Sequence, residues 1–371
     1  MSRPQTVLVT TTIRVPTFLK LVCENAARHG RTDFACLVIG DTKTPADARS
    51  FCQTLAQQTG ISIEYFDIAD QERALADHPA LSRLIPLNSG VRKQIGLFLA
   101  YLRGFQTVVM LDDDNFVTDT DFFGFHQAVG TQATVDLLAN PSGWQNVYEC
   151  LVEERGMPCY PRGYPWSQRT PTPPATIRTN TTARIVATNG FVLGDPDVDA
   201  ITRLFWPIRI TGMKPGYGPH IALAPGTWSP FNNQNTAITG ELLPVYFTPP
   251  STGRNADIWT AYVICRLTEH MGDVIAFGQP LVRQDRNPHN LWKDLDDEQV
   301  NNQATEPFVS TLREVRLTAR TYVEALDELI SGCLAVLPRV ACPPESRAMI
   351  ESFWTEYRQW AEICASAVVT K

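Results

Sequence analysis

The chain has 371 residues, of which 44% are hydrophobic and 9% aromatic. This composition is typical of globular proteins and excludes a disordered, low-complexity chain. The 32 basic and 39 acidic side chains give a formal net charge of -7 without long runs of one sign, so the charge pattern predicts no nucleic-acid partner.

The sequence predicts no membrane span and no secretory signal. Its apolar runs all fall short of the ~20 residues that a membrane helix needs, and the first residues lack the basic, apolar and small-residue regions of a signal peptide. The nine cysteines are scattered and contain no C-x-x-C pair, which is typical of reduced thiols. We therefore expect a cytoplasmic protein.

Strand and helix patterns alternate in the first third of the chain. Apolar, β-branched runs predict strands at 6–13, 34–41, 62–67 and 107–111, and helical spacing predicts helices that end at His29 or span 45–58 and 89–104. This alternation predicts an α/β fold with a Rossmann-like, mixed but mostly parallel sheet flanked by helices. Such sheets bind ligands beyond the carboxyl ends of their strands.

The rest of the chain has a different composition. Residues 157–174 (MPCYPRGYPWSQRTPTPP) are too rich in proline for a regular element and predict an ordered functional loop or lid. Further strands are expected at 183–193, 220–224 and 242–247, and amphipathic helices at 306–336 and 345–368. The acidic run DLDDEQ after Lys293 marks a boundary. We expect a catalytic domain over 1–298 and a C-terminal helical extension over 299–371.

Three adjacent carboxylates, Asp112-Asp113-Asp114, follow the strand predicted at 107–111. Because like charges repel, the cluster needs water or a cation to neutralise it. On an extended backbone Asp112 and Asp114 point to the same side and can bind one cation, while Asp113 turns toward the protein. Carboxylates suit Mg²⁺ or Mn²⁺ that also binds phosphate oxygens, and the buried strand favours this interpretation over a solvated acidic turn. The sequence has no P-loop, G-x-S-x-G or H-E-x-x-H motif, which leaves a metal and diphosphate site.

The D-x-D arrangement after a strand resembles that of GT-A nucleotide-sugar enzymes, and further segments narrow the resemblance. The chain is similar to the reversibly glycosylated polypeptide family (glycosyltransferase family 75), whose plant members include UDP-arabinopyranose mutases. The matching segments are TTTIR (10–14), LVIGD (37–41), VVMLDDDNFV (108–117), PRGYPWSQR (161–169), NGFVLGDPDVDA (189–200), APGTWSPFNNQNTAI (224–238), GRNADIW (253–259) and RNPHNLWKDLDDE (286–298).

This resemblance implies that Asp112 and Asp114 bind Mn²⁺ or Mg²⁺, and that the cation holds the diphosphate of a UDP-sugar. It also implies that Thr12, Arg14 and Asp41 lie near the nucleotide. The candidate nucleotide-sugar-binding residues, from the resemblance and from residue type together, are Thr12, Arg14, Asp41, Arg92, Asp113 and Asn235.

The resemblance further implies that Arg162 is the arginine that becomes reversibly glycosylated and that Arg169 is its essential neighbour. Chemistry alone favours a different role, because a guanidinium stays protonated and is a poor nucleophile but an excellent bidentate ligand for a diphosphate. Both interpretations place the two arginines in the site. A third interpretation is that they are a surface pair in a proline-rich loop, outside the site. The first two interpretations disagree on whether Arg162 carries a covalent sugar.

Other polar residues have both a functional and a structural interpretation. Asp257 is a candidate base or sugar-orienting carboxylate, or else the N-cap of the helix that follows it. Asn233 and Asn235 are candidates for binding sugar hydroxyls, or else turn residues. Arg92 and Lys93 face a phosphate, or else form a solvated first helical turn.

The chain departs from the family pattern at two places. One of two adjacent acids is replaced by Ala256, beside Asp257, and the family histidine before the N-P motif is missing. Asp285, His289 or water then serves as the third metal ligand. These losses favour an ordinary glycosyltransferase with a separate small-molecule or protein acceptor, whereas the arginine pair favours self-glycosylating, mutase-type chemistry.

A third hypothesis is a non-catalytic nucleotide-sugar-binding protein that works in a complex. Family members associate, and Phe353, Trp354 and Trp360 are expected on one helix as an interface, for example of a homo-oligomer. Such a protein is stabilised by UDP-sugar and Mn²⁺ but releases no UDP.

Overall fold

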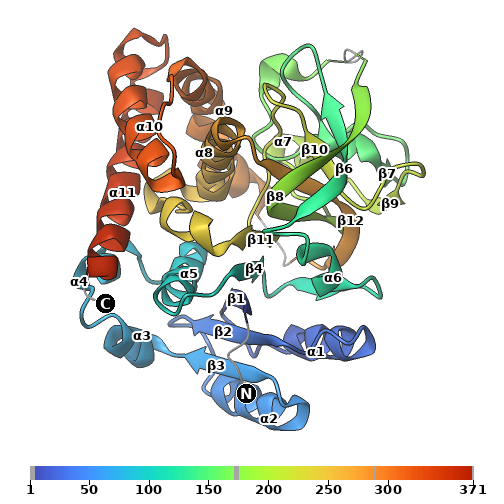
Figure 1. The fold of residues 1–371 in the computed structure, drawn as a ribbon, viewed down its shortest axis with the longest axis vertical. Coiled ribbons are helices and arrows are strands. Elements are labelled where there is room, and N and C mark those ends of the chain that lie inside the picture. Colours follow the sequence, from blue (N-terminus) through green and yellow to red (C-terminus); the bar gives the residue numbers. More distant parts are fainter. Residues whose placement is uncertain (1–4, 171–174, 287–289, 370–371) are drawn as a thin grey trace.

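A computed structural model describes residues 5–170, 175–286 and 290–369 (Figure 1). Its sheet begins with four parallel strands in the order β3 (Ser62–Phe66), β2 (Phe34–Gly40), β1 (Thr6–Thr12) and β4 (Thr107–Leu111). The helices of this part are α1 (Phe18–Arg28), α2 (Asp47–Thr59), α3 (Ile68–Ala74), α4 (Pro79–Leu84) and α5 (Lys93–Leu102), the last preceded by the 3₁₀ turn η1 (Gly90–Arg92). The strands and the three longer helices lie where the sequence predicts them.

Helices cover both faces of these parallel strands. Side chains of α1 and α2 pack with Leu8 on one face, and side chains of α5 pack with Val7 and Val9 on the other. Every residue of β2 is buried, as expected for a continuous apolar run inside a doubly covered sheet. The α5 helix lies so close to β1 that a Cβ on Gly96 would come within 2.4 Å of Val9 Cγ1.

The sheet continues with mixed strand directions beyond β4. Next to β4 lie β11 (Asn235–Thr239), β8 (Ile177–Gly194), β6 (Gln132–Ala139), β10 (Ile221–Leu223), β12 (Val274–Gln284) and β5 (Asn115–Val117), while β7 (Leu151–Glu153) and β9 (Ile210–Met213) extend from β8. Because β12 also pairs with β8, the strands β8, β6, β10 and β12 close on themselves. The expected α/β fold, with a mixed sheet flanked by helices, is confirmed.

Short helical segments connect the strands of this second part. They are α6 (Phe122–His126), η2 (Val147–Cys150), η3 (Trp166–Gln168), α7 (Ala200–Phe205), η4 (Gly240–Val245) and η5 (Pro250–Asn255). The strand predicted at 242–247 is wrong, because this segment forms the 3₁₀ helix η4 with Pro244 inside it. Proline has no N–H to donate to a strand ladder, which explains the difference. The proline-rich loop at 157–174 has little regular structure as far as residue 170, and its residues 171–174 lie outside the described ranges.

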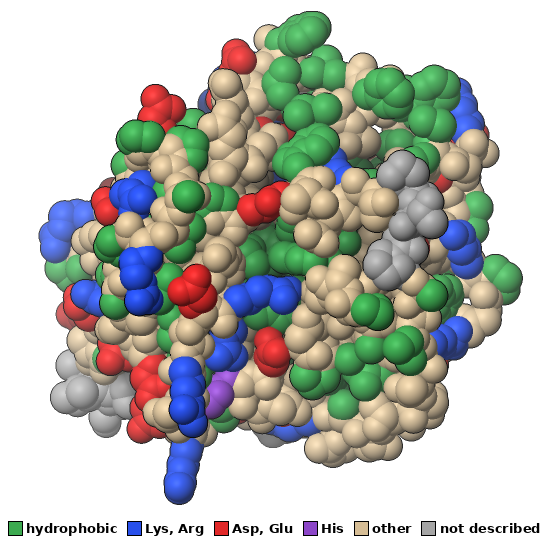
Figure 2. All heavy atoms as spheres, turned by 90° about the horizontal axis from the view of Figure 1, so that it is seen from above, with side chains coloured by type: hydrophobic (Ala, Val, Ile, Leu, Met, Phe, Trp, Pro, Cys, Tyr) green, Lys and Arg blue, Asp and Glu red, His purple; other side chains and the backbone are tan. Residues whose placement is uncertain are grey.

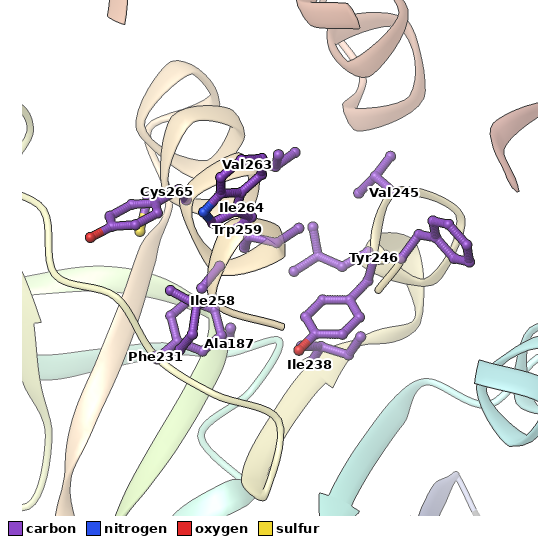
Figure 3. Close-up of a cluster of buried hydrophobic side chains, with 14 of the residues drawn as sticks. Ala187, Phe231, Ile238, Val245, Tyr246, Ile258, Trp259, Val263, Ile264 and Cys265 are labelled. Carbon is purple, nitrogen blue, oxygen red and sulfur yellow. The ribbon is translucent and has the colours of Figure 1, made fainter. Parts of the chain in front are cut away.

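Four helices form a bundle beside the second half of the sheet (Figure 1). They are α8 (Ala256–Met271), α9 (Leu291–Glu314), α10 (Tyr322–Val336), which ends in η6 (Leu337–Arg339), and α11 (Pro344–Val369). The apolar side chains of α8 pack with Ile238 of β11 and with Tyr246, which follows η4 (Figure 3). This contact fixes the first turn of α8 against the end of the central strands.

Two expectations for the C-terminal part are wrong. The helix predicted at 306–336 is broken, because α9 ends at Glu314 and the Thr321 side chain accepts a hydrogen bond from the Glu324 N–H at the start of α10. The aromatic residues Phe353, Trp354 and Trp360 do not form an exposed interface, because all three are fully buried in the core. Helix α9 runs across the position of the division predicted after residue 298, and the division itself stays a prediction.

Three further observations concern the membrane, the cysteines and the surface charge of the described residues. No helix in the described ranges combines the length and the apolar character needed to cross a bilayer. All nine cysteines lie in these ranges and are free, and eight of them are buried. Basic and acidic side chains are intermixed on the face seen in Figure 2.

Candidate functional site

A cavity of about 830 Å³ opens at the carboxyl ends of β1, β2 and β4. This is the edge at which parallel strands of an α/β sheet usually bind ligands. Its polar lining residues include Thr12, Asp41, Lys93, Asp112, Asp113, Asp114, Asn233, Thr252, Asp257, Asp297 and Asn301. The ends of the strands supply part of this lining, and η5, α9 and α11 supply another part.

The three adjacent carboxylates all line this cavity, but the backbone that carries them is not extended. The Asn115 N–H donates to the Asp112 carbonyl oxygen at 3.2 Å, so the chain makes a tight turn directly after β4. The predicted alternation of side chains along a strand is therefore wrong here. Asp113 is nevertheless held by protein groups as expected, because it accepts from Thr12 Oγ1 at 2.7 Å and pairs with Arg14 Nε at 3.4 Å.

The carboxylates of Asp112 and Asp114 influence each other electrostatically. Burial raises the pKa of Asp114, and the neighbouring Asp112 carboxylate raises it further. Gln284 Nε2 donates to Asp114 at 3.2 Å and fixes its orientation. Two hard oxygen ligands that repel each other fit Mg²⁺ or Mn²⁺, which commonly binds one or two carboxylates and takes its other ligands from water and phosphate.

A third ligand of the expected kind is not evident among the described residues. Within those ranges no group of three His, Cys, Asp or Glu side chains is placed to hold a metal. Asp285 is exposed, and its backbone N–H donates to the Asp114 carbonyl oxygen at 3.3 Å. His289 lies outside the described ranges.

Lys93, at the start of α5, links the acidic cluster to the other side of the cavity. Its side chain is only 3% exposed, and its ammonium donates to Asp112 Oδ1 and to the Asn233 carbonyl oxygen at 3.0 Å. The Asn233 N–H in turn donates to Asp257 Oδ2 at 3.4 Å. One lysine and one asparagine thus bring the acidic cluster and Asp257 into the same site.

The neighbouring Arg92 does not face the cavity, so the prediction that it binds a phosphate is not supported by its position. Its guanidinium is buried and donates to Gln71 Oε1 and to the Pro86 carbonyl oxygen at 3.3 Å. Successive residues of a helical turn point roughly 100° apart, so Lys93 and Arg92 reach different surroundings.

Asp257 lies in the first turn of α8 and lines the cavity with a side chain that is 15% exposed. It is not the N-cap, because Asn255 holds that position. Burial raises the pKa of Asp257; Arg162 opposes this effect, and Asp197 and Asp112 add to it.

Arg162 is buried behind Asp257 and does not line the cavity. Its Nε and Nη2 bind the two carboxylate oxygens of Asp197 at 2.8 and 2.9 Å, and Nη2 also reaches Asp257 at 3.3 Å. Its Nη1 donates to the Arg254 carbonyl oxygen and to Asn255 Oδ1. Burial alone would lower the pKa of Arg162, but the carboxylates of Asp197 and Asp257 raise it well above its usual value.

Arg169 is also engaged away from the cavity lining. Its guanidinium binds the buried Asp199 at 2.7 Å and lies 3.7 Å from the ring centroid of Trp166. Asp199 caps α7, so this arginine fastens the proline-rich loop to that helix. The structure thus brings neither predicted arginine into the cavity.

The remaining predicted residues divide into two groups. Thr12 and Asp41 line the cavity, and Asp41 accepts from the backbone N–H groups of Asn88 and Ser89 at 3.0 and 3.1 Å, which fixes that loop at the rim. Asn235 does not line it: this residue is buried in β11 and its Oδ1 contacts His126 Nε2 at 3.2 Å.

Residues of the C-terminal helices were not predicted as part of the site. Asn301 of α9 and Met349 of α11 line the cavity, together with Thr252 of η5. Their positions depend on helix packing across the whole chain, and no local motif indicates them.

Comparison with known proteins gives structural likeness but no match in sequence. No family model and no curated protein matches the chain, so membership of the reversibly glycosylated polypeptide family stays a prediction. Among solved structures the fold is similar to a mannosyltransferase from Pyrobaculum calidifontis in complex with GDP-Man and Mn²⁺. The TM-score is 0.36 and the identity 9%, over 100% of this chain and 75% of that one.

Proposed function

We propose that the protein is a metal-dependent, glycosyl-transferring enzyme that acts on a nucleoside diphosphate sugar. The observation that carries this proposal is the set of Asp112, Asp114 and buried Lys93 in a cavity at the carboxyl end of β4. Its volume of about 830 Å³ lies within the range of small-molecule sites. The sequence resemblance favours a UDP-sugar.

Asp112 and Asp114 are the residues that would hold Mn²⁺ or Mg²⁺. When bound, the cation neutralises charge on the departing diphosphate. Lys93 supplies a second positive charge at the same place, and its ammonium is a point donor suited to a phosphate oxygen. Asp113 keeps Thr12 and Arg14 in position beside the cavity.

We assign to Asp257 the role of orienting or deprotonating a sugar hydroxyl, because its carboxylate lines the cavity. Asn233 connects it to Lys93: the Asn233 N–H donates to Asp257, and the Asn233 carbonyl oxygen accepts from Lys93. Asp257 lines the cavity but is not part of the acidic cluster. Arg162 and Asp197 hold it from behind, which makes Arg162 a positioning residue for Asp257. A raised pKa suits a group that exchanges a proton near neutral pH.

The contacts of Arg162 favour an acceptor other than its own guanidinium. Each of its nitrogens that could carry a sugar already donates to a carboxylate or a carbonyl, and its raised pKa keeps it protonated. Covalent attachment there requires the attacking nitrogen to give up its hydrogen bond, to Asp197 for Nε or Nη2 and to the Arg254 carbonyl oxygen for Nη1, and to lose a proton. Transfer to a separate acceptor needs neither step, and self-glycosylating, mutase-type chemistry is the alternative.

Intact-protein mass and UDP release test the proposal together. The protein is incubated with UDP-pentoses and UDP-hexoses plus Mn²⁺, with EDTA and Arg162→Ala as controls. UDP release without an adduct supports transfer to a separate acceptor or to water. An added sugar that is lost in both controls supports the mutase-type alternative. Thermal stabilisation without UDP release over hours indicates a non-catalytic binder and contradicts enzymatic transfer.

A further inference from the structure

Two buried polar atoms of residues that line the cavity lack hydrogen-bond partners. Thr252 is 0% exposed and Asn301 is 1% exposed, and both residues line the cavity. In the described part of the chain, Thr252 Oγ1 and Asn301 Oδ1 each have no donor or acceptor within reach. Buried polar atoms in proteins are nearly always satisfied. Other buried polar atoms of the described residues, such as Thr239 Oγ1, also lack partners, so it is the position of Thr252 and Asn301 in the cavity lining that points to a ligand.

The surroundings of this pair determine which chemistry fits. Arg254 is the nearby cation, and it is occupied by Asp294 at 3.0 Å and Glu298 at 2.9 Å. Asp297 is paired with Lys293 at 2.6 Å. Thr252 and Asn301 therefore offer neutral hydrogen-bonding groups, whereas the charged groups that suit a diphosphate are at Asp112 and Lys93.

We infer that Thr252 and Asn301 form a subsite for the hydroxyl groups of a sugar ring. A hydroxyl both donates and accepts, so one ring can donate to Asn301 Oδ1 and accept from the Thr252 hydroxyl. Met349, which also lines the cavity, offers apolar surface to the C–H groups of the ring. η5 leads directly into α8, so the subsite adjoins Asp257. This inference rests on the proposed function and assigns its sugar-recognition residues to η5 and α9.

The sugar at this subsite comes either from the nucleotide sugar or from an acceptor, and binding measurements separate the two sources. Thr252→Val removes the hydroxyl and keeps the shape of the side chain. Asn301→Leu keeps the branching of the side chain, and besides Oδ1 it removes Nδ2, which donates to the Asp297 carbonyl oxygen at 3.3 Å. Thr239→Val is the matched control, because Thr239 Oγ1 is also buried and unpartnered but does not line the cavity. The probes are UDP, UDP-glucose, UDP-galactose and UDP-xylose, each with Mn²⁺, measured by titration calorimetry.

A donor sugar at the subsite predicts that each variant binds at least one UDP-sugar about tenfold more weakly while UDP binding is unchanged, because one lost hydrogen bond commonly has that effect. An acceptor sugar predicts unchanged UDP-sugar binding and weaker binding of free glucose, galactose or xylose to the complex with UDP and Mn²⁺. Unchanged binding of every probe by both variants, or an equal loss for UDP and UDP-sugars, overturns the subsite.

Thermal unfolding without ligand gives a readout that does not depend on the sugar. Removing an unsatisfied buried hydroxyl is expected to raise the melting temperature of both Thr252→Val and Thr239→Val. If Thr252→Val lowers the melting temperature and Thr239→Val does not, the Thr252 hydroxyl has a partner in the protein, and the inference is overturned. If the wild type binds neither UDP nor any UDP-sugar, the proposed function itself fails, which is a different result from normal binding by the variants.

Discussion

Replacement of Arg162 by methionine tests the buried ion-pair network that supports Asp257. The substitution keeps the length and apolar stem of the side chain but leaves Asp197 buried without its bidentate partner. Removing one member of a buried pair typically costs about 3–5 kcal/mol, because the remaining charge has lost both water and its counter-ion. The entropy of unfolding is roughly 2.1 cal/mol/K per residue. For a chain of 371 residues, the lost free energy therefore corresponds to a melting temperature about 4–6 °C lower.

The loss of stability in Arg162→Met should depend on pH in a defined direction. In the wild type Arg162 holds the pKa of Asp197 below its unfolded value near 3.9, although burial alone would raise it. The pair therefore stabilises the protein above that pH, and the stability is lost only as the pH falls through the folded pKa. In the variant, burial without a partner raises the pKa of Asp197, so the carboxyl takes up a proton as the pH falls. The difference between wild type and variant should be largest near pH 7 and shrink toward pH 4.

Urea unfolding at pH 7 and pH 4.5, followed by circular dichroism, measures both effects. Arg28→Ala is the control, because Arg28 pairs with Asp119 at the exposed surface and such pairs contribute at most about 1 kcal/mol. A cost for Arg162→Met no larger than that of Arg28→Ala at pH 7, or a cost that does not change with pH, would refute the assigned ion-pair network.

Three further predictions concern other parts of the molecule. Lys93→Met removes the ammonium that competes for Asp112, so added Mn²⁺ should raise the melting temperature more than in wild type, and an equal or smaller response contradicts this role. Gly96→Ala should lower the free energy of unfolding by about 1–3 kcal/mol through overpacking. Gly212→Ala is the control and should be nearly neutral, because there is open space around Gly212. Similar free energies of unfolding for the two variants would be inconsistent with the close contact of α5 and β1. Burial lowers the pKa of His126 to about 3, so folding stability should fall as the pH decreases from 6.5, where only the unfolded state takes up the proton. His126→Gln should flatten that pH dependence, and an unchanged slope in urea unfolding would exclude His126 as its source.

Local patterns predicted the part of the fold that positions the acidic cluster. The apolar run 107–111 forms β4 and ends at the three carboxylates, because a strand buried on both faces needs a continuous apolar sequence. The turn at Asp113 was missed, although Asp and Asn are common turn residues, because the pattern of the buried strand was extended into the acidic residues that follow it. The break before α10 had a readable signal, because Thr321 and Glu324 have the spacing of a capping box.

The rest of the candidate site depends on contacts between residues far apart in the chain. Arg162 and Asp197 are separated by 35 positions, and no spacing rule pairs them. Asn233 and Asn235 looked equivalent in the sequence, but only Asn233 lies before β11 and faces the cavity, whereas Asn235 is buried inside the strand. Asn301 belongs to a helix that was expected in a separate extension, and its place in the cavity wall results from the packing of α9 beside η5.

Titration calorimetry of UDP in the presence of Mn²⁺ tests the central claim most directly. The proposal predicts that the wild type binds UDP with Mn²⁺ and that EDTA or Asp114→Asn weakens binding at least tenfold, which corresponds to about 1.4 kcal/mol. Arg28→Ala should bind as the wild type does. UDP binding that is equally strong with EDTA and in Asp114→Asn would contradict a metal site at the acidic cluster, and no binding of UDP at all would contradict a site for uridine nucleotides.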